Sequence, residues 1–86
     1  MSGPAASTLD ALGLLCPLPV IRTQDRVREL KPGCVLEVLA TDPGAVHDIH
    51  AWCRVHGHEF LDHRECAAAL CDEAERAHIH IRLRTT

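Results

Sequence analysis

Aromatic residues are almost absent from this 86-residue chain, which contains one Trp, one Phe and no Tyr. Proteins that bind single-stranded nucleic acid stack bases on aromatic side chains, so this composition argues against a base-stacking surface. Positive charge is also scarce, since nine basic and twelve acidic residues give a net charge of −3 with neutral histidines. This balance offers no general electrostatic attraction for a phosphate backbone. We therefore expect no direct nucleic-acid partner.

Long hydrophobic runs are missing as well. No apolar stretch approaches the roughly 18 residues that indicate a membrane-spanning helix. The first residues, MSGPAAS, lack both the charged and the long apolar region of a signal peptide. We expect a flexible tail over residues 1–7, a single domain over residues 8–86, no membrane contact and a cytoplasmic location.

Cysteine and histidine, in contrast, are abundant, with five and seven copies. The cysteine count is odd and lies below the roughly 8–10% of a disulfide scaffold. Without a secretory signal, thiol chemistry or burial is the expected role of these cysteines. Histidines that titrate near pH ~6.5 would cancel the negative charge in mildly acidic solution, so net charge says little about protein partners.

The spacing of apolar residues predicts strands that alternate with helices. Strands are expected at 9–13, 34–40, 58–65 and 76–84, and helices at 17–31 and 42–57. Asp42-Pro43 is typical of a helix start, while Pro32-Gly33 and Gly57 are typical of helix ends. The order β-α-β-α-β-β predicts an α+β fold, a two-layer α/β sandwich in which two helices cover one face of a four-stranded mixed sheet.

Each predicted helix carries an apolar stripe. In the first it comprises Val20, Thr23, Val27 and Leu30 with Ile21 beside it, and in the second Val46, Ile49 and Cys53 flanked by Ala45, Trp52 and Val55. The strand at 34–40 is apolar at nearly every position and is expected inside the sheet, whereas 9–13 is expected at its edge. The last strand alternates strictly, which predicts that Ile79, Ile81 and Leu83 face the core and that the open face carries Glu37, His78, His80 and Arg82.

Cys16 is the cysteine best placed for chemistry. It directly precedes the first predicted helix, where free N–H groups and the helix dipole favour a thiolate, so we expect a lowered pKa. Pro17 and Pro19 stiffen the backbone around the sulfur and leave the N–H groups of Leu18 and Val20 facing it. No His or acid lies nearby in sequence, which suits a group that accepts and passes on an atom better than a self-sufficient hydrolytic nucleophile. The alternative is a cysteine that only caps the helix.

The segment around Cys16 resembles the opening signature of the TusA/SirA/YedF family of small sulfur carriers. The family's mark is Cys-Pro-x-Pro at the start of the first helix, which here is Cys16-Pro17-Leu18-Pro19 within residues 9–19. The similarity covers roughly residues 8–63, and its further matching groups are Lys31-Pro32-Gly33, Ala40-Thr41-Asp42-Pro43-Gly44, Asp48-Ile49 and Trp52-Cys53.

The resemblance implies a sulfurtransferase-type carrier that holds sulfur as a persulfide on Cys16 and needs no cofactor. Pro17 and Pro19 would shape the presentation of the sulfur, and Asp42 and Pro43 would start the second helix. The family's sulfur donors are cysteine desulfurases of the IscS type or rhodaneses, and its acceptors are TusD/DsrE-like proteins. The sulfur would go to tRNA 2-thiouridine, to sulfur oxidation or to molybdenum-cofactor synthesis.

The partner surface departs from the family pattern. Where relatives often carry a basic pair past the cysteine, this chain has Gln24-Asp25, so Arg22 and Arg26 are the candidate partner contacts on a monomeric carrier. The alternative function is a non-catalytic regulatory or interaction module on the same fold.

The other cysteines and the histidines have weaker patterns. Cys53 lies on an apolar stripe and is expected to be buried packing, while Cys34 fits either role. Propensity alone favours a helix over residues 66–75, but the family fold favours a loop with partial helix, and a Cys66–Cys71 disulfide there is a minor alternative. The spacing of His47, His50 and Cys53 and the His-x-His pairs could serve zinc, but no Cys-x-x-Cys occurs, so we expect no metal.

Overall fold

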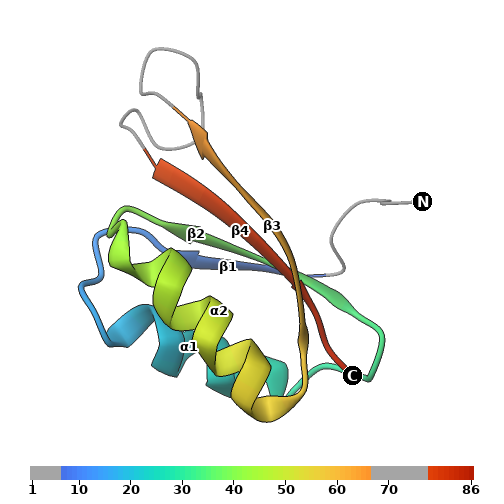
Figure 1. Cartoon of the computed structure of the whole chain (residues 1–86). Helices are drawn as coiled ribbons and strands as arrows, with labels where there is room; N and C mark the ends of the chain where they lie inside the picture. Colours follow the sequence, from blue (N-terminus) through green and yellow to red (C-terminus); the bar gives the residue numbers. More distant parts are fainter. Residues whose placement is uncertain (1–6, 67–77) are drawn as a thin grey trace.

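The computed structural model describes residues 7–66 and 78–86. The elements follow the predicted order, as Figure 1 shows. They are β1 (Ser7–Ala11), α1 (Leu18–Val27), β2 (Val35–Ala40), α2 (Gly44–His56), β3 (Glu59–Cys66) and β4 (His78–Arg84).

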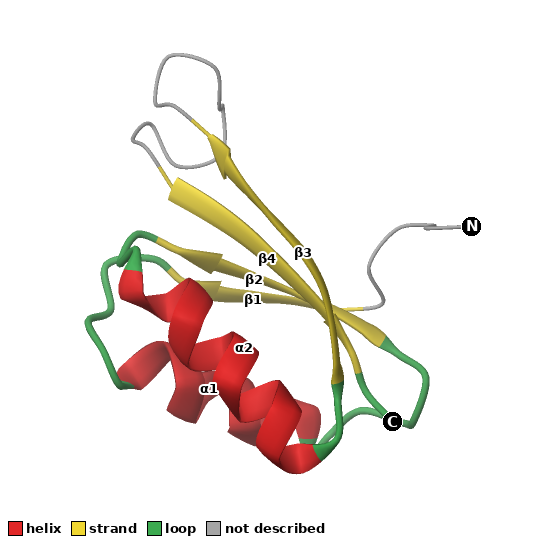
Figure 2. Cartoon of the chain, viewed as in Figure 1, coloured by secondary structure: helices red, strands yellow, loops and turns green. Residues whose placement is uncertain are grey.

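The four strands form one mixed sheet in the order β1-β2-β4-β3. β1 runs parallel to β2, whereas β4 is antiparallel to both β2 and β3. Because a parallel pair needs a crossover connection, α1 links β1 to β2 across one face of the sheet. Figure 2 shows both helices on that same face. The predicted fold class is thereby confirmed, with β1 at an edge and β2 inside.

The core lies between this sheet face and the two helices. Alternate residues of β2 and β4 point into it, and their fully buried side chains are those of Leu36, Val38, Ala40, Ile81 and Leu83. α2 contributes Ile49 and Cys53, also fully buried, as its stripe predicts.

The exposed face of each helix differs from the prediction. α1 buries Pro19 and Thr23, which are four residues apart and therefore share the face toward the sheet. Ile21 lies two residues from each of them, so it points away from the sheet and is exposed. Val55, expected beside the stripe of α2, is also exposed because it lies two residues from buried Cys53.

The open face of the sheet contains two buried histidines that we expected in solvent. His78 is 2% and His80 7% exposed. His80 Nδ1 lies 3.1 Å from Glu37 Oε2, and its Nε2 lies 3.0 Å from His78 Nε2. Strand alternation correctly predicts which face the two histidines lie on, but it does not predict how far they are buried. Their polar contacts offset the cost of removing the two rings from water.

Several sequence expectations concern residues that the structure does not describe. Ser7, placed at the end of the expected tail, is the first residue of β1, and residues 1–6 lie outside the described part. The loop with partial helix expected at 66–75 lies outside it from residue 67 on, as does the start of the last predicted strand. Among the described residues, none of the helices combines the length and apolar character that a bilayer crossing requires.

Candidate functional site

Cys16 lies in the loop between β1 and α1, and its side chain is exposed. Its backbone N–H donates to Asp42 Oδ2 at 2.9 Å, and its thiol donates to Asp48 Oδ2 at 2.7 Å. Earlier in the same loop, the N–H of Gly13 donates to Thr41 Oγ1 at 2.9 Å. The loop after β1 is therefore held against the start of α2, at the end of the sheet where β1 and β2 both finish (Figure 1).

Asp42 connects the cysteine loop to α2 through both carboxylate oxygens. Oδ1 accepts from the N–H of Gly44 at 2.9 Å, and Oδ2 accepts from the N–H of Cys16. Its backbone carbonyl also accepts from Ala45 at 3.0 Å. Asp42, which we expected to start the second helix, thus has a further role. It accepts from the first free N–H of α2 and also holds the backbone of Cys16 in place.

Cys16 does not cap α1. The residue at the N-cap position is Pro17, joined to Cys16 by a cis peptide bond, and the helix start has no side-chain cap. The N–H of Leu18, expected to face the sulfur, donates instead to the carbonyl of Leu15 at 2.9 Å. The interpretation of Cys16 as a helix cap is therefore wrong.

The expected lowering of the thiol pKa is also wrong. The pKa of Cys16 is raised, first because its thiol donates a hydrogen bond to Asp48. Partial desolvation and the negative charges of Asp48 and Asp42 act in the same direction. Sequence reasoning missed these carboxylates because they follow Cys16 by 26 and 32 residues.

Asp48 is the residue of the candidate site that reasoning from local sequence did not find. Asp48 belongs to the motifs that match the family, and this was the signal that could have singled it out. In the structure it is the acceptor of the Cys16 thiol proton. It can therefore hold that proton, or release it, at the reacting sulfur.

The other residues predicted around Cys16 have separate roles. Pro19 is fully buried against the core, whereas Pro17 is exposed beside the sulfur. Arg22 is exposed on α1. Arg26 points back to β1, where its guanidinium donates to Ser7 Oγ at 2.8 Å and to the Thr8 carbonyl at 3.0 Å.

The histidines and remaining cysteines do not converge on a metal centre in the described part of the chain. There, no group of three or more His, Cys, Asp or Glu side chains could hold a metal ion. Cys53 is buried in the core, while the ring of His50 stacks on Phe60 with centroids 4.5 Å apart. Cys34 is half-buried.

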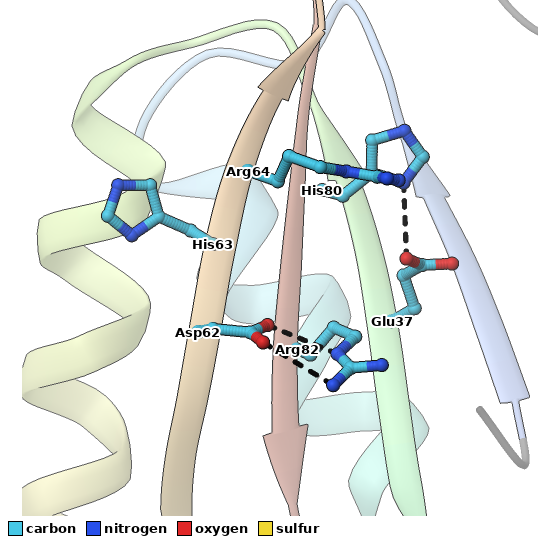
Figure 3. Close-up of a pocket in the computed structure, with 6 residues that line it drawn as sticks. All are labelled: Glu37, Asp62, His63, Arg64, His80 and Arg82. Carbon is cyan, nitrogen blue, oxygen red and sulfur yellow. Dashed lines mark hydrogen bonds and ion pairs between the residues drawn. The ribbon is translucent and has the colours of Figure 1, made fainter. Parts of the chain in front are cut away.

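A polar concavity of about 280 Å³ lies on the open face of the sheet (Figure 3), and Cys16 is not among the residues that line it. Arg82 donates to both oxygens of Asp62, at 3.1 and 3.4 Å, and His80 pairs with Glu37. In Figure 3, the ring of His63 points away from these side chains, toward the side of α2. The cross-strand pairs satisfy one another, so we interpret this concavity as part of the sheet's own polar network.

Comparisons with known proteins agree with the geometry around Cys16. The family described as Sulfurtransferase TusA matches residues 7–71. Sulfur carrier protein TusA of Pseudomonas paraeruginosa is 45% identical over 76% of this chain and 82% of its own length. YrkF of Bacillus subtilis is 49% identical over 66% of this chain, which spans only 31% of that protein's length.

A solved structure shows the same fold. The crystal structure of a SirA-like protein from Desulfitobacterium hafniense has a TM-score of 0.65 to this structure at 25% sequence identity. The similarity covers 91% of this chain and 95% of that one. The resemblance that the motifs predicted is thereby confirmed, and the chain belongs to the TusA family of sulfurtransferases.

Proposed function

We propose that this protein is a sulfur carrier that holds sulfane sulfur as a persulfide on Cys16. The observation that carries the proposal is an exposed thiol whose backbone and proton are both fixed by carboxylates of another segment, Asp42 and Asp48. The thiol is exposed, so its sulfur is accessible to another protein. Chemistry at such a site depends on a donor and an acceptor that bring the remaining groups.

Sulfur transfer at this site is a balanced exchange. The Cys16 thiol gives its proton to Asp48 Oδ2, and Sγ attacks the outer sulfur of the donor's persulfide. The sulfur–sulfur bond of the donor breaks, its cysteine leaves as a thiolate and receives the proton, and Cys16 keeps the outer sulfur as a persulfide. One thiol and one persulfide enter and one of each leave, so no oxidant or reductant is consumed.

The partners belong to the same proposal. A cysteine desulfurase of the IscS type or a rhodanese would supply the sulfur, and a TusD/DsrE-like protein would receive it. The route would end in tRNA thiolation, sulfur oxidation or molybdenum-cofactor synthesis, with the carrier acting as a cytoplasmic monomer. We restrict the proposed partner contacts to Arg22, because the guanidinium of Arg26 is engaged with β1.

Loading the protein with sulfur tests the proposal. It is incubated with a cysteine desulfurase and cysteine, or with a rhodanese and thiosulfate, and its intact mass is measured. We expect a gain of about 32 Da, one sulfur atom, that disappears in Cys16→Ser and persists in Cys34→Ser. If no donor produces the gain, or if it persists in Cys16→Ser, the protein is better described as the non-catalytic interaction module.

A further inference from the structure

Exposed hydrophobic side chains are concentrated around Cys16. In residues 7–66 and 78–86, the exposed large hydrophobic side chains are those of Leu15 (71% exposed), Leu18 (42%), Ile21 (47%) and Val55 (79%). The first three, which we call the apolar rim, belong to the cysteine loop and the first turn of α1. Val55 lies near the opposite end of α2 from Asp48, about 10 Å along the helix axis.

The apolar rim adjoins Cys16 along the chain. Leu15 directly precedes Cys16, and Leu18 and Ile21 are three residues apart, so they share one face of α1. Arg22 follows Leu18 by four residues and borders the same face. Leaving apolar side chains in water forgoes the free energy of burying them, and such a surface bordered by polar groups is typical of a protein interaction site.

The charges beside the sulfur indicate which kind of side chain this partner carries. Asp42 and Asp48 place two carboxylates next to Cys16, and the thiol donates directly to one of them. A protein whose own sulfur reaches Sγ meets the rim and these carboxylates in one contact. A basic side chain opposite Asp48 would complement the charge and would favour the thiolate at the moment of contact.

We infer that the apolar rim is the docking surface for a protein sulfur donor, which presents an apolar face with a basic side chain opposite Asp48. This inference rests on the proposed carrier function. The inference predicts different behaviour for protein donors and for small-molecule donors. A small persulfide molecule can reach the exposed Cys16 thiol without covering Leu15, Leu18 or Ile21.

The test compares a protein donor with a small one on matched variants. The protein donor is a desulfurase with cysteine or a rhodanese with thiosulfate, and the small donor is glutathione persulfide. Leu15→Gln and Leu18→Gln remove apolar surface without adding charge, and Val55→Gln is the control at an exposed apolar site away from Cys16. Circular dichroism verifies that each variant is folded.

We expect each rim variant to slow loading from the protein donor about tenfold or more, the loss of a good interface contact. Loading from glutathione persulfide should stay within about twofold of the unchanged protein, since both variants keep the thiol and its carboxylates. Val55→Gln should behave as the unchanged protein with both donors. Added salt should slow loading from the protein donor, because it screens the attraction to Asp48.

The outcomes that contradict the inference differ from those that contradict the carrier function. If glutathione persulfide and the protein donors all fail to load Cys16, the carrier function itself is wrong. If rim variants load from the protein donor at the normal rate, or only glutathione persulfide loads Cys16, the docking surface is wrong while the carrier stands. If sedimentation shows a dimer that the rim variants dissociate, the rim contacts a second copy of this chain.

Discussion

At the scale of single residues, Cys16 depends on carboxylates that are distant in sequence. The start of α1 favours a negative charge, but this effect is screened at an exposed site. Asp48 acts through a direct hydrogen bond from the thiol and through its charge, and Asp42 adds a second negative charge. The thiol is thus kept protonated in the free carrier, and a protonated thiol is less readily oxidised than a thiolate.

Replacing Asp48 should make Cys16 more reactive toward a simple alkylating agent. In Asp48→Asn the charge and the strongest acceptor are lost, so the pKa of the thiol falls and more thiolate is present at neutral pH. The rate of Cys16 alkylation by iodoacetamide, followed by mass spectrometry across pH, should rise several times near pH ~7. Asp25→Asn, on the exposed face of α1, is the matched control and should leave the rate unchanged. An unchanged or slower rate in Asp48→Asn would show that the carboxylate does not control the thiol.

Cys53 should be inert for a different reason. Burial raises the pKa of its thiol to about 11, and the side chain has no exposure to solvent. In the native protein at pH ~8, alkylation should therefore reach Cys16 and leave Cys53 unmodified until the chain unfolds. Peptide mapping at increasing urea concentration checks this. Modification of Cys53 at zero urea, at a rate near that of Cys16, would mean that the core is open.

At the scale of secondary-structure elements, the end of α2 is a defined junction with β3. Gly57 adopts a left-handed conformation with φ 79°, and its N–H donates to the carbonyl of Cys53. The N–H of His58 donates to the same carbonyl at 2.9 Å. Only a residue that tolerates positive φ can end the helix in this way, so the glycine at position 57 was sufficient to predict the end of the helix from the sequence.

Gly57→Ala should destabilise the fold by about 1–2 kcal/mol, the strain of a side chain in the left-handed region. No atom outside the neighbouring residues lies within 4 Å of an added Cβ, so the cost is conformational and not steric. Gly57→Asn should cost less, since Asn tolerates this conformation. Urea unfolding of the unchanged protein and the two variants measures the order of their stabilities. Equal stability of Gly57→Ala and the unchanged protein would refute the prediction.

The histidine between α2 and β3, His58, should make stability depend on pH. The pKa of His58 is lowered by desolvation and by the charge of His56, and its Nδ1 accepts the N–H of Thr86 at 3.3 Å. The folded protein then binds this proton less readily than the unfolded chain. The contribution of His58 is complete above the unfolded pKa of ~6.5 and is lost as pH falls through the lowered folded value.

Unfolding in urea at pH ~7.5 and pH ~5.5 should therefore show lower stability at the acidic pH, with a smaller difference in His58→Gln. His47→Gln, at an exposed position of α2, is the control and should keep the pH dependence of the unchanged protein. If His58→Gln has the same pH dependence as the unchanged protein, the contribution assigned to His58 is absent.

At the scale of the whole molecule, local patterns predicted the architecture but not the electrostatics of the site. Apolar periodicity and helix-end residues such as Gly57 act over a few residues, so they located the elements and the two-layer fold. The contacts of Cys16 with Asp42 and Asp48 form only when the starts of the two helices meet. For the same reason, alternation placed His80 on the open face but could not predict its burial against Glu37.

The fold has a simple consequence for function. The crossover through α1 and the helix after β2 bring the loop after β1 and the start of α2 to one end of the sheet. The loop supplies the thiol, and its carboxylates come from Asp42, just before α2, and from Asp48 within α2. The core lies elsewhere, between the sheet and the helices. The sulfur can therefore be exchanged at the surface without opening the core.

The most direct test of the central claim is the intact mass of the protein and of Cys16→Ser, measured in parallel after incubation with a sulfur donor. We predict one added sulfur, about 32 Da, on the unchanged protein alone. Dithiothreitol should remove it, since a thiol takes the outer sulfur of a persulfide. An equal gain on Cys16→Ser, or no gain with protein donors and glutathione persulfide alike, would contradict the claim.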